Sequence, residues 1–251
     1  MRFQGKHVVI TGGGSGLGAE LARQFAAKEA HVTILGRRME ALQEVAGETG
    51  ALPLSCDVTQ RDSLDLAVSK AIAEQGAVDI ALANAGAAPS KAFEQMDEAD
   101  FTDALGVNLL GVFNLWQACL PGMKALGWGR LIAVASTAGL KGYPYVSGYC
   151  AAKHGVVGLT RALAVELAKS GVTVNALCPG FIETPLLEES LDLIVAKTGM
   201  SREQAAKSLR RGNPQDRFIQ PSEVAEAALW LASEAAGSVN GSALPISGGE
   251  I

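Results

Sequence analysis

Hydrophobic residues occur along this chain in short runs that alternate with longer amphipathic stretches almost to its end. The short runs are rich in Val, Ile, Leu and Ala, which is typical of strands that are buried on both faces of a sheet. The predicted strands are residues 7–11, 31–35, 52–57, 78–84, 130–136, 172–178 and 243–246. The predicted helices between them are residues 16–28, 39–49, 61–74, 97–126 and 147–169.

Alternation of strands and helices predicts right-handed βαβ units and therefore an α/β fold with a doubly wound parallel sheet. The chain has 251 residues and no Pro- or Ser-rich linker, so we expect a single dinucleotide-binding catalytic domain over residues 1–251. Residues 186–216 interrupt the alternation with a polar, helix-prone insertion. We predict that this segment is a helical lid over the substrate.

Composition and charge narrow the class of protein. The net charge is −5 and the Lys and Arg residues are scattered, which argues against nucleic acid or an anionic membrane as a partner. No apolar run reaches the roughly 18 residues of a membrane helix, and the N-terminus lacks a signal-peptide region, so a cytoplasmic protein is expected. The four cysteines form no CxxC and the three histidines are isolated, so we expect reduced thiols and no metal site.

A glycine-rich turn, Thr11-Gly12-Gly13-Gly14-Ser15-Gly16-Leu17-Gly18, joins the first predicted strand to the first predicted helix. Such a turn lets the backbone approach a pyrophosphate, and the N-terminus of the helix directs its N–H groups at the anion. The glycines are spaced more widely than in a strict GxGxxG. The place of the turn predicts dinucleotide binding, whereas its composition alone would also fit a flexible turn.

Tyr149 and Lys153 are four residues apart in a predicted helix, which puts both side chains on one face. We expect the ammonium group of Lys153 to lower the pKa of Tyr149 from about 10, so that the phenol can act as an acid or base near neutral pH. Ser136 ends the fifth predicted strand, where ligands of open α/β sheets bind. Thr137 is the competing hydroxyl.

Taken together, these motifs resemble the short-chain dehydrogenase/reductase family. The glycine-rich turn is similar to the family's cofactor motif, Asn84-Ala85-Gly86 to its NAG motif and Pro179-Gly180 to its PG motif. The spacing of Ser136, Tyr149 and Lys153 matches the family's active-site pattern and selects Ser136 over Thr137. The resemblance covers essentially the whole chain. It implies a Rossmann-like sheet of seven strands in the order 3-2-1-4-5-6-7.

The resemblance also implies a catalytic tetrad of Asn108, Ser136, Tyr149 and Lys153. Ser136 would bond the substrate oxygen, and Tyr149 would transfer the proton. Lys153 would support Tyr149 and bind the nicotinamide ribose, and Asn108 would help to hold a water that links Lys153 to solvent. The expected reaction is hydride transfer between a nicotinamide dinucleotide and a secondary alcohol or ketone.

The remaining residues that the resemblance implies are in contact with the cofactor. Asp57 would bond the adenine amino group, and the backbone at Ile182 with the Thr184 hydroxyl would hold the nicotinamide carboxamide. The full implied set is Gly12, Ser15, Gly16, Leu17, Gly18, Asp57, Val58, Asn84, Ala85, Gly86, Tyr149, Lys153, Pro179, Gly180, Ile182 and Thr184.

The end of the second predicted strand favours NADP(H). NAD-preferring members of the family commonly carry an Asp there, whereas this chain has Gly36-Arg37-Arg38. A guanidinium binds a 2′-phosphate through two hydrogen bonds, and a carboxylate would repel it. We expect Arg37 to be the main contact and Arg38 a secondary one. NAD(H) remains the alternative, because Ser15 stands where some NADP-dependent members carry a basic residue, and an ordinary solvated arginine pair would also fit.

Position suggests Ala138, Leu140, Tyr143, Tyr145 and the segment 186–216 as substrate contacts. The basic side chains of that segment, Arg202, Lys207, Arg210 and Arg211, either meet a thioester or carboxylate or form a solvated face. Residues 218–225 resemble relatives that reduce 3-oxoacyl groups or oxidise 3-hydroxybutyrate, which favours a 3-hydroxyacyl or 3-oxoacyl substrate. The alternatives are a sugar or polyol dehydrogenase that uses NAD(H), or a non-catalytic dinucleotide-binding sensor on the same fold.

The family resemblance also implies a homotetramer, with the Tyr149-bearing helix and the C-terminal strand in contact with other subunits. Val156, Val157, Leu159 and Leu163 give that helix more apolar surface than one buried face requires. We therefore expect a homotetramer. Apart from its own subunits and the cofactor, the only partner expected is a small-molecule substrate.

Overall fold

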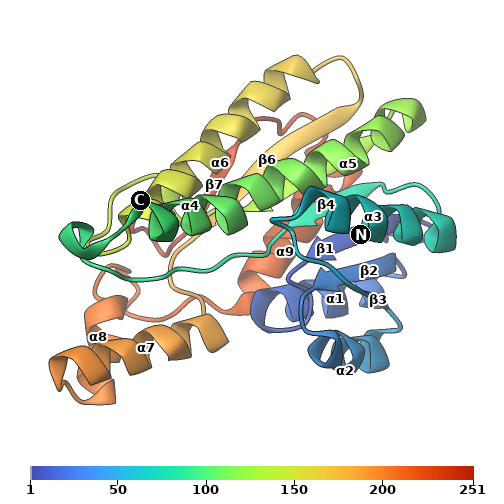
Figure 1. Ribbon diagram of the computed structural model, residues 1–251. Helices are drawn as coiled ribbons and strands as arrows, with labels where there is room; N and C mark the ends of the chain where they lie inside the picture. The colour runs from blue at the N-terminus through green and yellow to red at the C-terminus, as the bar shows by residue number, and fades with distance from the viewer. Residues whose placement is uncertain (1) are drawn as a thin grey trace.

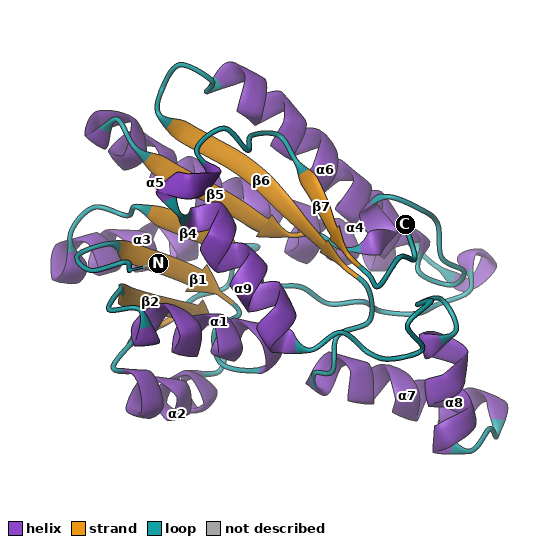
Figure 2. Ribbon diagram, turned by 180° about the vertical axis from the view of Figure 1, so that it is seen from behind, coloured by secondary structure: helices purple, strands orange, loops and turns teal. Residues whose placement is uncertain are grey.

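The sheet of this protein is parallel throughout, with the strand order β3-β2-β1-β4-β5-β6-β7 (Figures 1 and 2). The structure is a computed structural model that describes residues 2–251. Its strands are β1 (His7–Thr11), β2 (His31–Gly36), β3 (Leu52–Ser55), β4 (Ile80–Ala83), β5 (Gly129–Val134), β6 (Val172–Pro179) and β7 (Ala243–Ile246). The predicted fold class and strand order are confirmed.

Three strands, β3, β4 and β5, end one or two residues earlier than predicted. Beyond two of these ends the backbone bonds to side chains instead of to a neighbouring strand. The amide of Asp57 donates to Ser63 Oγ at 3.1 Å, and the amide of Asn84 donates to Thr11 Oγ1 at 3.0 Å. A strand pattern in the sequence continues past such points because the residues remain partly buried, although the sheet hydrogen bonds have stopped.

Helices cover both faces of the sheet, as the two opposite views show (Figures 1 and 2). One face packs against α1, α2 and α9 around fully buried side chains such as Phe25 and Leu229. The other face packs against α3, α5 and α6 around Trp116, Leu64 and Val156. The helices are α1 (Gly16–Ala27), α2 (Met39–Thr49), α3 (Arg61–Gln75), α4 (Glu98–Leu105), α5 (Gly111–Leu126), α6 (Ser147–Glu166), α7 (Pro185–Thr198), α8 (Arg202–Arg210) and α9 (Pro221–Ala232).

The predicted helix 97–126 is not uniform. A turn of π-helix, Gly106–Leu110, separates α4 from α5 and has Asn108 at its centre. An extra residue in a helical turn is a feature that occurs mostly at functional sites, because it redirects a side chain. The hydrophobic period of the sequence does not reveal a single inserted residue, which is why the stretch reads as one helix.

The same stretch, Glu98–Leu126, is long and apolar enough to cross a membrane by length and composition alone, with 44% of its most apolar window buried. Its apolar residues include Leu115, Trp116 and Met123, which lie in the protein core at 0–1% exposure. Packing under the sheet therefore explains its composition.

Helix α9 is absent from the sequence prediction, although its start carries a local signal. Pro221 is its first residue; the Glu223 side chain accepts the Gln220 amide at 2.8 Å, and the Glu223 amide donates to the Gln220 carbonyl at 3.0 Å. This arrangement satisfies the free amides at the start of a helix. Its inner residues Val224, Ala225, Ala228 and Leu229 are buried, so α9 packs beside α1 and covers β5 and β6.

Candidate active site

The glycine-rich turn between β1 and α1 is shaped by backbone contacts that no side chain would permit. Gly12 and Gly16 have φ values of +69° and +52°, which L side chains rarely adopt. A Cβ on Gly18 would lie 2.0 Å from the carbonyl oxygen of Gly12. The glycines thus allow a tight turn whose backbone, with no side chains at these positions, lies at the N-terminus of α1.

The N-terminus of α1 has free amides. The first amide of this helix that donates to a backbone carbonyl is that of Ala19, to Ser15 at 3.2 Å. Within residues 2–251, the amides of Gly16, Leu17 and Gly18 have no backbone acceptor. The Ser15 hydroxyl makes no capping hydrogen bond. Free amides at a helix N-terminus bind anions, so this part of the site fits the pyrophosphate of a dinucleotide, with Leu17 contributing only its backbone because its side chain is buried.

The predicted NAG segment is attached to the same turn. The Asn84 side-chain amide donates to the Thr11 carbonyl at 2.9 Å, and the Ala85 amide donates to Thr11 Oγ1 at 3.1 Å. Thr11, whose role the sequence analysis missed, therefore holds the end of β4 to the end of β1. The only signal for it in the sequence is its place at the head of the glycine-rich turn.

Ser136, Tyr149 and Lys153 come together at the carboxyl end of β5. The Ser136 hydroxyl accepts the Ala138 amide at 3.0 Å and lies close enough to the Tyr149 hydroxyl to stabilise a tyrosinate. The ammonium of Lys153 lies 5.5 Å from the centre of the Tyr149 ring and donates to the Val134 carbonyl at 2.8 Å. Lys153 is only 3% exposed, whereas Tyr149 stays partly accessible, as a group that reaches the substrate requires.

The structure corrects the expected electrostatics of this pair. Burial raises the pKa of Tyr149, and the nearby Ser136 hydroxyl opposes that rise without reversing it. Burial also lowers the pKa of Lys153 to about 8. The expected lowering of the Tyr149 pKa by Lys153 is therefore wrong for this structure, because desolvation of the phenolate exceeds the stabilisation by neighbouring groups. Tyr149 is held in its protonated form, which suits a proton donor to a developing alkoxide.

Asn108 approaches the same place from the π turn. It is fully buried, and its amide nitrogen donates to the carbonyls of Ala87 at 2.8 Å and Ala104 at 3.0 Å. A Cβ on Gly86 would lie 2.9 Å from Asn108 Oδ1 and 3.7 Å from Lys153 Nζ. Gly86 therefore lies between Asn108 and Lys153, and its lack of a side chain lets the two approach each other. The structure brings the whole predicted tetrad into one region.

The predicted adenosine side lies at the ends of β2 and β3. Oδ1 of Asp57 already accepts the amide and hydroxyl of Thr59, at 2.9 and 2.8 Å, and these bonds lower the pKa of Asp57. The side chain of Val58 is buried and its carbonyl accepts from Asn114 at 2.9 Å, so only its amide remains for a ligand. Asp57 thus forms the strand-end turn and keeps only Oδ2 for an adenine.

The arginines that follow β2 are exposed at this same edge. Arg37 is near enough to Asp57 to lower its pKa slightly, after the larger effect of the Thr59 bonds. Neither Arg37 nor Arg38 forms an ion pair within the described residues. Both guanidinium groups are therefore free to meet a ligand.

The loop after β6 closes the opposite side. Gly180 continues the sheet edge by donating its amide to Ile246 at 3.0 Å, and Pro179 is the last residue of β6. Ile182 forms a parallel bridge with Ile219, which ties this loop to the start of α9. The Thr184 Cβ lies 3.3 Å from the position of a Cβ on Gly16. The loop after β6, which is predicted to hold the nicotinamide, is thus next to the glycine-rich turn, called the phosphate turn below.

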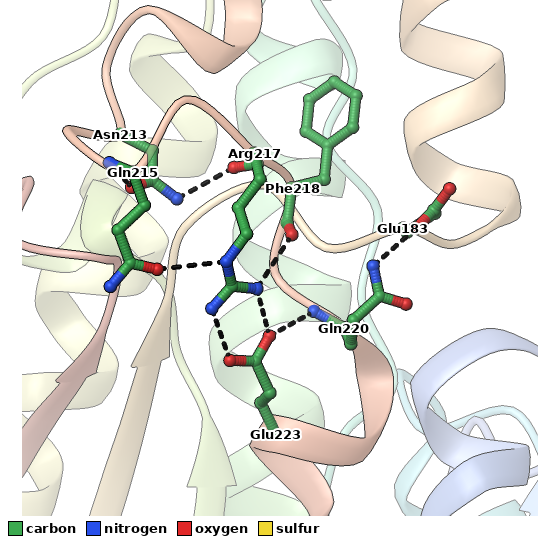
Figure 3. A network of polar contacts seen from close by, with 7 residues as sticks. All are labelled: Glu183, Asn213, Gln215, Arg217, Phe218, Gln220 and Glu223. Carbon is green, nitrogen blue, oxygen red and sulfur yellow. Dashed lines mark hydrogen bonds and ion pairs between the residues drawn. The ribbon is translucent and has the colours of Figure 1, made fainter.

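A polar network fixes the two chain segments that lead into and out of α7 and α8 (Figure 3). Arg217 donates to both carboxylate oxygens of Glu223, at 2.6 and 2.7 Å. Gln220 donates to Glu183 at 2.6 Å, which connects the start of α9 to the loop after β6. The segment between these anchors has a small core of its own, formed by Leu187, Leu191, Ala205 and Ala206 with partly buried neighbours.

The basic residues of α8 and its C-terminal end are less available than expected. Arg202 pairs with Glu188 and Asp192 of α7, and Arg210 pairs with Glu203 at 2.7 Å. Lys207 and Arg211 are exposed and form no ion pair within residues 2–251. Two of the four cations thus stabilise the segment itself.

The predicted substrate contacts divide into two groups. Ala138 is 2% exposed and so lines no open surface, whereas Leu140 is half-buried against the core. Tyr143 packs edge-on against Phe181 of the loop after β6, with ring centres 6.3 Å apart. Tyr145 is 65% exposed. Tyr143 is the contact candidate that the structure places between the ends of β5 and β6.

The arrangement as a whole fits a nicotinamide dinucleotide, whose pyrophosphate the phosphate turn would hold and whose nicotinamide the loop after β6 would hold. When bound, this group supplies or accepts the hydride. Ser136 would bond the carbonyl oxygen of the substrate, and Tyr149 would deliver the proton, with Lys153 beside it. Fold and site define a dinucleotide-dependent oxidoreductase that acts on hydroxyl and keto groups.

Comparison with known proteins supports this class and supplies the family. The model of the short chain dehydrogenase family matches residues 6–194, and the chain belongs to that family. It is 36% identical to a 3-oxoacyl-(acyl-carrier-protein) reductase of Thermotoga maritima, with 99% of each chain covered. It is 34% identical to a D-beta-hydroxybutyrate dehydrogenase of Rhizobium meliloti, with 97% of this chain and 98% of that protein covered.

Among solved structures, the chain is similar to a variant of actinorhodin polyketide ketoreductase determined with NADPH. The TM-score is 0.94 at 34% sequence identity, with 98% of this chain and 97% of that chain covered. The predictions of family, fold and enzyme class are confirmed.

Proposed function

We propose that this enzyme uses NADP(H) in preference to NAD(H). The observation that carries the proposal is the free guanidinium of Arg37 at the end of β2, directly after a glycine that has no carboxylate to offer a ribose. The NADPH bound to the similar ketoreductase supports the same choice. Arg37 would bond the 2′-phosphate, with Arg38 as a weaker neighbour.

Substitution of Arg37 by Ala is expected to lower kcat/KM for NADPH by about 10- to 150-fold, the range for one hydrogen bond to a charged group, with little effect on NADH. Gly36→Asp should shift the preference toward NADH. A Cβ at Gly36 meets only Leu42, at 3.5 Å, so the aspartate fits without strain. Steady-state kinetics with both cofactors measure these changes, and Arg38→Ala serves as the neighbouring control. A parent enzyme that prefers NADH tenfold or more would refute the assignment.

We propose a ketone or secondary alcohol of the 3-oxoacyl or 3-hydroxyacyl type as the substrate. Support comes from the two relatives, one named for a 3-oxoacyl group and one for hydroxybutyrate. The single catalytic domain would include residues 186–216 as its lid, since α7 and α8 stand apart from the sheet (Figures 1 and 2) and have a small core of their own. Reduction of a panel of ketones, followed by the decrease in NADPH absorbance, tests this proposal. Absence of activity with every β-keto compound contradicts it.

We also propose a homotetramer, on a surface that shares only Leu159 with the four apolar residues expected to form the interface. Val156 and Val157 lie in the core at 0% and 3% exposure, so they contribute no interface. An apolar surface instead runs along α4, α5 and α6. It is lined by Thr102, Leu105, Gly106, Leu109, Leu110, Phe113, Gly155 and Leu159.

Sedimentation tests the assembly at micromolar concentration. We expect a tetramer for the parent and a smaller species for Phe113→Asp, because Phe113 is 40% exposed at this surface and burial of a charge there is costly. Leu66→Asp, at a 58% exposed position on α3, is the matched control and should leave the assembly unchanged. A monomeric parent rules out the proposal.

A further inference from the structure

The penultimate residue of the chain, Glu250, is buried beside the candidate active site although glutamates usually remain exposed. Its side chain is 4% exposed. Figures 1 and 2 show the C-terminus close to α4 and α6, at the end of the sheet where the site lies. A buried carboxylate requires hydrogen-bond donors, and it disfavours a negatively charged ligand nearby.

Two side chains from the loop after β5 hold Glu250. The Tyr143 hydroxyl donates to its Oε1 at 2.6 Å, and the Lys141 ammonium lies 2.8 Å from the same oxygen. Since the single Tyr143 proton goes to Glu250, the contact of 2.7 Å between Tyr143 and Thr137 has Thr137 as donor. This chain of hydrogen bonds ends one residue from Ser136, whose hydroxyl is predicted to bind the substrate oxygen.

The position of Glu250 is enforced by the backbone around it. A Cβ on Gly212 would lie 2.7 Å from Oε1, and one on Gly180 would lie 3.2 Å from Oε2. Gly248, with φ +64°, would place a Cβ 2.0 Å from Asn213 Oδ1. The tail is thus seated between the loop after β6 and the segment that follows α8. Oε2 faces Gly180 and has no donor within the described residues.

Two lysines close to Tyr143 and Tyr145 are already engaged in ion pairs. Lys141 is paired with Glu250, and Lys91, whose amide donates to the Tyr145 carbonyl at 2.8 Å, is paired with Asp100. Burial and the bond to Glu250 raise the pKa of Tyr143, so that hydroxyl stays a neutral donor. A substrate carboxylate placed beside Tyr143 would find both of these ammonium groups paired and would face the Glu250 carboxylate, which is buried and therefore less screened by water than a surface charge.

We infer that Glu250 is a specificity-determining residue that selects uncharged ketones, such as β-keto esters and thioesters, against free β-keto acids. The inference rests on the proposed substrate type and narrows it. It separates the chemistry of the two relatives: this chain would share the acyl substrate of the reductase and reject the free acid that the name of the dehydrogenase describes.

The test uses 3-oxobutanoate and its methyl ester, which differ only in the charged group. The parent should reduce the ester with a kcat/KM at least tenfold higher than the acid. Glu250→Gln keeps the shape and frees Lys141, so the ratio of acid to ester should rise about tenfold or more, through a lower KM for the acid. Lys141→Met leaves the carboxylate without its ion-pair partner and should lower the same ratio.

Opposite changes in the two variants are the signature of charge, because loosening of the tail by either substitution would move the ratio in one direction. Glu226→Gln, at an exposed position of α9, is the control and should leave the ratio within twofold. A parent that prefers the acid, or a ratio that moves the same way in Glu250→Gln and Lys141→Met, overturns the inference.

Binding gives a readout that is independent of turnover. If the parent reduces neither compound, the proposed substrate type fails, and calorimetric titration of the acid and ester into the enzyme with NADP⁺ still reports their relative affinities. The same order of parent, Glu250→Gln and Lys141→Met is expected for those affinities. Equal relative affinities in all three proteins would overturn the role of Glu250.

Discussion

Substitution of Tyr149 by Phe is expected to lower kcat about 10²- to 10⁴-fold, the contribution of general acid–base catalysis by one side chain. Phe keeps the ring and its packing but removes the proton that the alkoxide must receive. Because burial raises the pKa of Tyr149, the phenol is protonated throughout the neutral range, so the loss should be nearly constant with pH in ketone reduction. The rate of NADPH oxidation measures catalysis, and titration of the enzyme with NADPH, followed by fluorescence, measures cofactor binding separately.

The dinucleotide affinity of the Tyr149→Phe enzyme should change little, because most of the predicted cofactor contacts lie on other elements. The chain offers a matched control in Tyr145→Phe, which makes the same chemical change at a residue that is 65% exposed. That variant should retain turnover within a few-fold of the parent. Turnover of the Tyr149→Phe enzyme at a comparable level would remove Tyr149 as the proton donor.

Substitution of Lys153 by Met is expected to stop most turnover and at the same time to stabilise the protein. Burial lowers the pKa of Lys153 from 10.5 to about 8, and this shift corresponds to about 3 kcal/mol of disfavoured charge in the folded state. The hydrogen bond to the Val134 carbonyl is also lost, and it offsets about 1–2 kcal/mol. At pH 7 the free energy of unfolding should therefore rise by about 1–2 kcal/mol.

The pH dependence identifies the cause. A lysine whose folded pKa lies below its unfolded pKa destabilises the protein fully below pH 8, where it is charged in both states. That penalty disappears as the pH rises from about 8 to 10.5, since the folded protein then releases the proton first. The stability advantage of Lys153→Met should shrink over the same range.

Urea unfolding without added dinucleotide measures these differences. Lys169→Met, at an exposed lysine just after α6, should change stability by no more than about 0.5 kcal/mol. Destabilisation of Lys153→Met by more than about 1 kcal/mol at pH 7, with no change in its difference from the parent at higher pH, would show that the ammonium is not strained by burial. We expect Lys153→Met to lose activity and gain stability, because the buried charge that serves catalysis destabilises the folded protein.

The pattern of the sequence predicts most of the fold because burial has a local signature. Apolar runs such as Val8-Val9-Ile10 mark strands that are covered on both faces, and the family motifs place the ends of β1, β4, β5 and β6 at one site. The same pattern does not register one extra residue in the turn at Asn108. Nor does it show where sheet hydrogen bonds stop, since Asn84 stays protected when its amide bonds Thr11.

The candidate site is predictable in the identity of its residues and much less so in their electrostatics. Spacing puts Tyr149 and Lys153 on one helix face, but the direction of the Tyr149 pKa shift depends on how much water the packed site excludes. Likewise, Arg202 and Arg210 read as available cations in the sequence. Only the packing of α8 against α7, and the position of Glu203, show that carboxylates already occupy them.

The sequence by itself determines the parallel α/β architecture, the phosphate turn and the order of the catalytic residues, because each depends on neighbours within a few positions or on motifs with a fixed spacing. The tertiary structure alone decides that Glu250 reaches Tyr143, 107 positions earlier in the chain. A glutamate after two glycines carries no local mark of burial. Its role depends on which loops the fold brings to the carboxyl edge of the sheet, and that is a property of the assembled chain.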